Sequence, residues 1–189
     1  FALFFQLKID YLYFYLYQIF MKKILFPILL IFITTISLAE EQIQISFSNE
    51  STKYWQYISD RTMGGISDGQ AVIEQDEDIF FVRLTGNVST ENNGGFIQLR
   101  STFSFTNLNI ENKKIKGVRL NVRGNGETYH IFIRTNETKS YRDYYSATFI
   151  ANNKWKIVEL PFTKFKHRFS NKALEGNDIR TFGIVAYGR

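Results

Sequence analysis

Cysteine is absent from this sequence of 189 residues, and histidine occurs only twice. Without cysteine the chain can form no disulfide, no thiolate metal site and no lipid-modified cysteine. A serine hydrolase would have to use His130, within an expected strand, or His167, in the basic stretch KFKHRF, and neither lies beside a nucleophile elbow. The sequence therefore favours a domain that is held together by packing alone and has no catalytic triad.

A long apolar run that spans a membrane is also missing. Residues 1–20 are rich in aromatic side chains, but polar residues such as Gln6 and Asp10 interrupt them. From Met21, two lysines, an apolar stretch over residues 24–36 and a small-residue ending form the pattern of a secretory signal peptide. We expect an upstream non-native extension at 1–20, a signal peptide at 21–39 and one domain at 40–189, secreted or periplasmic.

Neither sign of charge dominates the expected mature domain. The formal net charge of the whole sequence is +5, and lysines near the N-terminus contribute part of it. This balance predicts no nucleic-acid partner, because such proteins carry a strongly basic patch. We also expect that the chain is not an integral membrane protein once the signal peptide is cleaved.

Helical periodicity is not evident after residue 40, apart from one short helix expected over residues 171–179. Alternating apolar and polar residues recur instead, separated by Gly, Asn or Asp. The expected strands span residues 43–49, 70–75, 79–88, 94–105, 117–124, 128–135, 144–151, 155–162 and 181–188. Many short strands in one domain predict an all-β sandwich or barrel.

The stretch GVRLNVRGNGETYHIFIR predicts a β-hairpin with a type I′ turn at Asn125 and Gly126. The residues expected to pair on its core-facing side are Val122 and Tyr129, Leu120 and Ile131, and Val118 and Ile133. The opposite side is then cationic, because successive side chains of a strand point to opposite faces. It carries the binding candidates Arg119, Asn121, Arg123, His130, Phe132 and Arg134.

The stretch DRTMGGISDGQ resembles a phosphate-binding loop at first sight. Its glycines from Gly64 have the P-loop spacing, but Gln70 stands where a lysine would reach the phosphate. The turn GNGETY likewise precedes a strand, not the helix whose N-terminus binds a pyrophosphate. We therefore expect no nucleotide site. Gly64 and Gly65 instead permit a positive φ or a close backbone approach, in a turn tied by hydrogen bonds from the side chains of Asp60 and Ser67.

Acidic residues cluster in the stretch EQDED at residues 74–78. A solvated hairpin turn explains them, although calcium also favours several oxygen ligands from a flexible loop. Because the stretch lacks EF-hand spacing and a closing glutamate, we predict no metal site there, and calcium binding stays an open alternative. A carboxylate pair for glycoside hydrolysis depends on distances that a sequence does not give.

Five stretches, in order, resemble the complex I intermediate-associated protein 30 family. They are YWQYISDRTMGGISDGQ, FFVRLTGNVSTENNGGFIQLRS, GVRLNVRGNGETYHIFIRT, WKIVELPFTKF and RTFGIVAYGR, and they extend over residues 54–189. The resemblance implies a jelly-roll β-sandwich of the galactose-binding type. It also implies a relation to non-enzymatic assembly factors that act as chaperones on intermediates of respiratory complex I. Since the family pattern continues into a further strand, we expect the reading frame to be truncated after Arg189.

The resemblance also assigns family positions within the first four stretches. In the first two stretches they are Trp55, Asp60, Met63, Gly64, Gly65, Ser67, Asn92, Asn93, Gly94, Gly95, Phe96 and Arg100. In the next two they are Arg123, Gly124, Gly126, Tyr129, Trp155, Pro161 and Phe162. Of these, Trp55, Asp60 and Arg123 are candidates for contact with a partner or ligand, and the others are expected to have structural roles.

Two functions follow as hypotheses. The first is a non-catalytic assembly module that docks a protein, such as a membrane-complex intermediate, through the cationic face, since arginine and aromatic residues are enriched at interface hot spots. The second is an exported carbohydrate-binding module, in which Trp55 and its neighbours Tyr54, Tyr57 and Asp60 form a platform for a sugar ring. Trp55 also suits the core of a sandwich. We predict neither enzymatic activity nor a cofactor.

Overall fold

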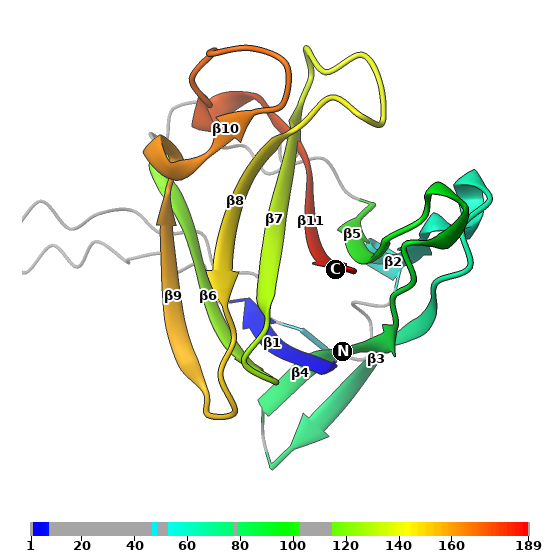
Figure 1. The fold of residues 1–189 in the computed structure, drawn as a ribbon. Helices are drawn as coiled ribbons and strands as arrows, with labels where there is room; N and C mark the ends of the chain where they lie inside the picture. The colour runs from blue at the N-terminus through cyan, green and yellow to red at the C-terminus, as the bar shows by residue number, and fades with distance from the viewer. Residues whose placement is uncertain (1, 8–46, 49–52, 78, 103–114, 189) are drawn as a thin grey trace, which may run out of the picture.

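Alternating apolar and polar residues fold most of this chain into antiparallel strands. The computed structural model describes residues 2–7, 47–48, 53–77, 79–102 and 115–188. Two sheets face each other as a β-sandwich of the jelly-roll type, which confirms the expected fold class (Figure 1).

One sheet has five strands in the order β3-β4-β1-β6-β9, and the other has six in the order β10-β8-β7-β11-β5-β2. The five-stranded sheet contains β1 (Ala2–Leu7), β3 (Asp68–Asp76), β4 (Ile79–Asn87), β6 (Gly117–Gly124) and β9 (Lys156–Pro161). The six-stranded sheet contains β2 (Trp55–Ser59), β5 (Phe96–Ser101), β7 (Thr128–Thr135), β8 (Tyr145–Ile150), β10 (Lys166–His167) and β11 (Ile179–Tyr187).

Helical structure in the described part is limited to short 3-10 turns, and none is long and apolar enough to cross a membrane. They are η2 (Asp60–Met63), η3 (Glu91–Asn93), η5 (Phe162–Lys164), η6 (Gly176–Asp178) and the described end of a further turn at residues 53–54. The helix expected over residues 171–179 is therefore wrong. Leu174 is buried in the core, and Gly176 packs so closely on the backbone of Ile115 that a Cβ would lie 2.4 Å from its carbonyl oxygen.

Each strand expected from residue 70 onward has a counterpart in the structure. The strand expected over residues 43–49 lies almost entirely outside the described residues. β3 and β4 form a hairpin in which Asp76 pairs with Ile79, so residues 74–76 of the acidic stretch belong to β3, and Glu77, which follows them, has a φ of 53°. No group of three potential metal-ligating side chains occurs among the described residues.

The hairpin expected between β6 and β7 is wrong, because the two strands belong to different sheets. β6 pairs with β1 and β9, whereas β7 pairs with β8 and β11. Gly126 has a φ of 85°, but Asn125 has no positive φ, and a type I′ turn requires both. The main-chain N–H of Gly126 instead donates to the carbonyl of Ala151, which follows β8. The turn thus carries the chain across the sandwich.

The core lies between the sheets and contains all the residues expected from the hairpin pattern. Val118, Leu120, Val122, Tyr129, Ile131 and Ile133 are buried, because the inner face of each strand faces the opposite sheet. Trp55 is 8% exposed, and its ring centroid lies 5.5 Å from that of Phe47 and 6.4 Å from that of Phe182. The core position expected for Trp55 is therefore confirmed, and its buried ring does not form the alternative sugar platform.

β1 occupies the middle of the five-stranded sheet, between β4 and β6 (Figure 1). In register, Phe5 pairs with Val82 of β4 on one side and with Val122 of β6 on the other. Part of the expected upstream extension thus supplies a central strand here. That residues 1–20 lie upstream of the native start stays a prediction, and residues 21–39 and Arg189 lie outside the described residues.

Candidate functional site

The stretch DRTMGGISDGQ forms a turn around the fully buried carboxylate of Asp60. The main-chain N–H of Ser67 donates to Oδ1 at 2.9 Å, and the Ser67 hydroxyl donates to Oδ2. The main-chain N–H groups of Gly95 and Phe96 also donate to Oδ2, at 2.5 and 3.1 Å. The expected tie between Asp60 and Ser67 is therefore confirmed, and it extends to the start of β5.

The charge of Asp60 is stabilised by these donors. Burial alone raises the pKa of Asp60, but the hydrogen bonds from Ser67, Gly95 and Phe96 outweigh burial and hold the pKa below its usual value. The carboxylate is thus ionised at neutral pH and has its acceptor sites occupied by protein donors. Asp60 is a structural anchor, and the proposed sugar contact by its side chain is wrong because no surface of it is exposed.

Glycines make room for this anchor. Gly64 has a φ of 89°, as the sequence predicted, and caps η2. A Cβ on Gly65 would lie 2.4 Å from Cγ of Asp60, and a Cβ on Gly94 would lie 2.6 Å from its Oδ2. Gly95 has a φ of 132°. These family positions therefore shape the backbone around one carboxylate.

The six residues expected on one cationic face lie on opposite sides of the sandwich. Arg119, Asn121 and Arg123 are on β6 of the five-stranded sheet, and His130, Phe132 and Arg134 are on β7 of the six-stranded sheet. Arg119 forms an ion pair with Glu159 at 2.7 Å, and the guanidinium of Arg123 lies 5.0 Å from the ring centroid of Trp155. The single face is wrong because residues 125–127 connect different sheets.

A groove of about 810 Å³ lies over the outer face of the six-stranded sheet and contains Phe132 and Arg134. We call it the arginine groove. Its lining comprises Ile58, Thr62, Met63, Gly94, Phe96, Gln98, Arg100, Phe132, Arg134, Tyr141, Arg142, Tyr144, Arg168 and Tyr187. None of these residues is acidic, and four are arginines. The groove therefore contains two of the six candidates of the expected cationic face, together with residues that were not predicted as binding candidates.

Strand register explains how the floor of the groove forms. Gly183 of β11 lies between Arg100 of β5 and Phe132 of β7, and pairs with both. A Cβ at this position would lie 2.1 Å from Nε2 of Gln98, so glycine lets the Gln98 amide lie across the middle strand. That amide is buried, and its nitrogen has no hydrogen-bond partner in the described structure.

Arg134 is the most deeply placed charge in the groove, with 7% of the residue exposed. Its Nη2 donates to the carbonyl of Tyr141 at 2.8 Å, but its Nε and Nη1 have no hydrogen-bond partner in the described structure. Burial, followed by repulsion from Arg100, lowers the pKa of Arg134 to about 10, so the side chain stays charged at neutral pH. Burial and nearby Arg180 likewise lower the pKa of Arg100.

Aromatic rings support the arginines. Phe132 and Tyr144 are buried and stacked, with ring centroids 3.8 Å apart. The guanidinium of Arg134 lies 5.6 Å and that of Arg168 5.3 Å from the Tyr144 centroid, and Arg168 donates to the Tyr144 hydroxyl at 2.6 Å. Arg142 lies 5.3 Å from the ring of Tyr141. Such contacts orient guanidinium groups and leave their N–H edges directed away from the ring faces.

The sequence contained a partial signal for this groove. Phe96, Arg100 and Met63 were selected only as family positions, and Tyr144, Arg168 and Tyr187 were not selected at all. The outward positions of β5 and β7 carry two arginines, one glutamine and one aromatic residue, a composition that is unusual for a sheet face. They are Gln98, Arg100, Phe132 and Arg134. However, the pairing of both strands with β11 was not deducible from spacing. His130 is on the same face and T-stacks on Tyr187, and burial lowers its pKa.

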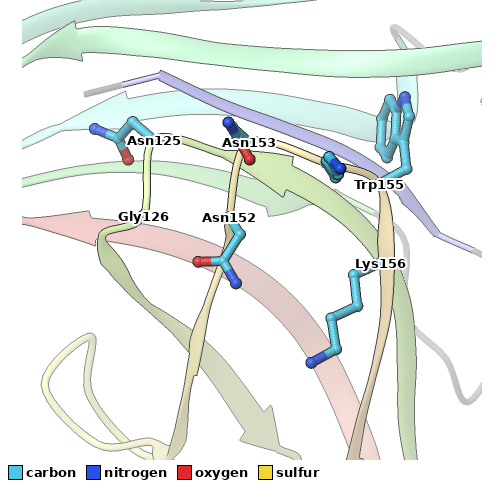
Figure 2. Close-up of a pocket in the computed structure, with 7 residues that line it drawn as sticks. Asn125, Gly126, Asn152, Asn153, Trp155 and Lys156 are labelled. Atoms are coloured by element: carbon cyan, nitrogen blue, oxygen red, sulfur yellow. The ribbon is translucent and has the colours of Figure 1, made fainter.

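A second cavity, of about 580 Å³, lies where the connections β6–β7 and β8–β9 meet (Figure 2). It is lined by Asn125, Gly126, Asn152, Asn153, Lys154, Trp155 and Lys156. Figure 2 shows the indole of Trp155 directed away from Asn152 and Lys156. That ring also contacts Phe81 at a centroid distance of 5.7 Å. Because these side chains diverge, the second cavity is less suited to grip a ligand than the arginine groove.

Asp143, His167 and Ser170 lie in a row that the sequence analysis did not foresee. His167 Nε2 is 2.8 Å from Oδ1 of Asp143, and His167 Nδ1 is 2.9 Å from Oγ of Ser170. The main-chain N–H of Phe169 also donates to Nδ1, and that of Lys172 donates to Ser170 Oγ. Neither cavity is lined by these three residues. The row is therefore a set of loop hydrogen bonds that holds the end of β10.

Comparison with solved structures identifies relatives of this fold. The family 11 carbohydrate-binding module of the cellulosomal cellulase Lic26A-Cel5E of Clostridium thermocellum is 12% identical, with a TM-score of 0.55, over 71% of this chain and 79% of that chain. The Clostridium thermocellum family 11 module in complex with a β-1,3-1,4-mixed-linked tetrasaccharide is 13% identical, with a TM-score of 0.54, over 71% and 80%. At this identity the similarity establishes the fold alone.

Sequence comparison is more specific. No curated protein sequence matches this chain. A family model, however, matches residues 45–189, and it describes complex I intermediate-associated protein 30 (CIA30). The match covers both sheets from β2 onward, including the Asp60 anchor and the arginine groove. The chain therefore belongs to the complex I intermediate-associated protein 30 family.

Proposed function

We propose that this protein is a non-catalytic binding domain that takes part in the assembly of respiratory complex I by holding a partner protein in the arginine groove. Membership of the family supports an assembly-related role. The observation that carries the proposal for the site is the groove itself, where arginines and aromatic rings gather without any acidic lining residue. Interfaces are enriched in these two residue types, and a few such residues carry most of the binding energy.

A capture experiment tests this role. The full-length protein is immobilised through an affinity tag, exposed to detergent-solubilised membranes of its host, and the retained proteins are identified by mass spectrometry. We expect complex I subunits to be enriched, and deletion of the gene to make complex I intermediates accumulate on native gels. Normal complex I assembly in the deletion strain, together with no enrichment of its subunits, would contradict the proposal.

Export is a second part of this proposal. The signal-peptide pattern from Met21 supports a secreted or periplasmic location. An exported domain meets only the side of an inner-membrane complex that faces the periplasm, which restricts the partner surface. N-terminal sequencing of the exported protein is expected to begin at Glu40, so that the processed domain would lack β1 (Ala2–Leu7) between β4 and β6. An N-terminus before Met21 would contradict the expected processing.

Glycan binding is the alternative function, and two observations favour it. The fold is similar to that of a carbohydrate-binding module whose structure contains a mixed-linked tetrasaccharide. The second cavity also combines a tryptophan with three asparagines, which are residue types that contact sugars in many proteins. A glycan array with the full-length protein separates the two functions. Saturable binding to one class of neutral glycan would favour the alternative over protein assembly.

A further inference from the structure

We propose that the arginine groove recognises an extended acidic protein segment, whose carboxylates bind the guanidinium edges of Arg134 and of the arginines around it. This inference rests on the proposed function, because it specifies the chemistry of the partner that the same groove holds. It goes beyond that function in assigning a charge and a set of contact residues to the ligand.

The first argument is the incomplete hydrogen bonding of Arg134. A guanidinium has five N–H donors. In Arg134, Nε and Nη1 have no hydrogen-bond partner in the described structure, and only 7% of the residue is exposed to solvent. A buried charge without a counter-ion lowers the stability of the folded state. A ligand that supplies a negative charge and hydrogen-bond acceptors would remove this loss. The neighbouring nitrogen of Gln98 is a second buried donor without a partner. The groove thus presents unused donors and requires acceptors.

The second argument is the positive charge of the arginine groove. Arg100, Arg142 and Arg168 line the groove with Arg134, and no ion pair of any of them with an acidic residue occurs in the described part of the chain. The nearby charges that act on Arg134 include Arg100 and Arg180. Like charges held this close repel each other, and a ligand with several negative charges relieves that repulsion.

The third argument distinguishes a peptide from a sugar. A sugar ring needs an open aromatic face, but Phe132 and Tyr144 are stacked on each other and are 5% and 8% exposed. Of the other lining rings, Tyr141 has a guanidinium 5.3 Å from its centroid, and the half-buried rings of Phe96 and Tyr187 contact each other at a centroid distance of 6.2 Å. Guanidinium edges instead match carboxylates, which they bind through two parallel hydrogen bonds. A chain with acidic side chains fits these donors better than a stacked sugar.

The test measures binding of defined probes to the full-length protein by calorimetry. The probes are an octapeptide with four glutamates, the same octapeptide with glutamines, tetragalacturonate, and a neutral mixed-linked tetrasaccharide. We expect the glutamate peptide to bind at least about tenfold more tightly than each of the other three, since charge-assisted pairs carry the affinity. We also expect its affinity to fall as salt is added, because screening weakens charge pairs.

Variants locate the site. Arg134→Met is expected to weaken binding of the glutamate peptide by at least about tenfold, and Arg134→Lys by less, since lysine keeps the charge but loses the fork. Without ligand, Arg134→Met is expected to melt at the same temperature as the wild type or higher, because the variant removes a buried unsatisfied charge. If Arg134→Met does not fold, Arg100→Gln and Arg168→Gln replace it. Arg119→Gln, on the opposite sheet, is the matched control.

Several outcomes would overturn the inference. Equal binding of the glutamine peptide excludes charge recognition, tighter binding of tetragalacturonate assigns the groove to an acidic glycan, and no binding of any probe at millimolar concentration excludes an acidic segment. An affinity for the glutamate peptide that is unchanged in both Arg134→Met and Arg100→Gln excludes the arginine groove as the binding site. If these variants still support complex I assembly in the deletion strain, the acidic segment and the groove as its site are both excluded, while the assembly role of the protein stands. If the glutamate peptide binds in the groove but deletion of the gene has no effect on complex I, the inference stands and the proposed function fails.

Discussion

Asp60 and Ser67 are joined twice, since the main-chain N–H of Ser67 donates to Oδ1 of Asp60 at 2.9 Å and the Ser67 hydroxyl donates to Oδ2. The same carboxylate accepts hydrogen bonds from the main chain of Gly95 and Phe96. It therefore ties η2, the start of β3 and the start of β5 together. Because η2 and β5 contribute Met63 and Phe96 to the arginine groove, this anchor also shapes one wall of the binding site.

Replacing Asp60 is expected to be costly. Asp60→Asn removes the charge that four donors recognise and places an amide N–H₂ against main-chain N–H groups. We expect the free energy of unfolding to fall by about 2–4 kcal/mol, as measured by urea denaturation at pH 7. Asp68→Asn is the control, since Asp68 is exposed and its 3.5 Å ion pair with Arg61 is worth less than about 1 kcal/mol. Equal losses in the two variants would refute the anchor role.

Wild type and Asp60→Asn together also test how stability depends on pH. Because the folded state lowers the pKa of Asp60, its ionisation stabilises the fold above the unfolded carboxyl pKa of about 3.9. That contribution is lost as the pH falls through the lower, folded value. The stability difference between wild type and Asp60→Asn should therefore shrink below about pH 4. Urea denaturation between pH 7 and pH 3 measures it, and a constant difference would speak against the assigned pKa direction.

Neighbouring glycines separate two physical effects. Gly65→Ala places a Cβ 2.4 Å from Cγ of Asp60 and should disrupt the anchor, with a loss of about 2 kcal/mol or more. Gly64→Ala meets no atom within 4 Å but holds alanine at a φ of 89°, which costs about 1–2 kcal/mol. Only the Gly65 variant should also lose the pH dependence that Asp60 provides. Gly65→Val that folds with unchanged stability would contradict the close packing.

Arginines on the two sheets should behave differently. The double variant Arg119→Glu with Arg123→Glu changes the charge of the five-stranded sheet and is expected to leave the affinity for the glutamate peptide within about twofold, because the groove is on the other sheet. The pair Arg100→Glu with Arg168→Glu should abolish measurable binding. Calorimetry measures the affinity of each variant for the glutamate peptide. A similar loss of affinity in both double variants would contradict the assignment of the site to the six-stranded sheet alone.

β1 provides a test of strand complementation. A chain that starts at Glu40 lacks the strand that pairs with β4 and β6, so the facing edges of both strands lose hydrogen bonds. We expect it to melt at a lower temperature than the full chain, and a peptide of residues 1–8 added in trans to raise that temperature by mass action. A scrambled peptide is the control. Identical melting of both chains, with no effect of the peptide, would refute the central position of β1.

Local features of the fold were predictable from the sequence, but the pairing of strands was not. Alternation located β3 to β9 and β11, although not the short β10, and the inward side chains of β6 and β7, because burial on one face leaves a period of two. The Asn125-Gly126 turn suggested a hairpin, yet it leads from one sheet to the other. A turn that crosses a sandwich and a turn that closes a hairpin use similar residues, and long-range pairing decides between them.

The site shows the same division. The glycine turn and its tie between Asp60 and Ser67 were predictable, since all their residues lie within one short stretch. The arginine groove combines β2, β5, β7 and β11 with η2 and with the segments after η3, between β7 and β8 and after β10, so residues far apart in sequence meet only through the sheet order. The groove floor also depends on Gly183, whose importance appears only when its neighbours on both adjacent strands are known.

The most direct test of the central claim is an NMR titration that observes the arginine Nε–H signals while the glutamate octapeptide is added to the full-length protein. Arg134 Nε has no hydrogen-bond partner in the described structure of the ligand-free protein, so a carboxylate that binds there must change its environment. We predict that the Arg134 Nε–H signal shifts in proportion to saturation and that the signals of Asn152 and Trp155 in the second cavity do not. An Arg134 signal that is unchanged at saturation, with shifts confined to Asn152 and Trp155, would contradict the arginine groove as the binding site.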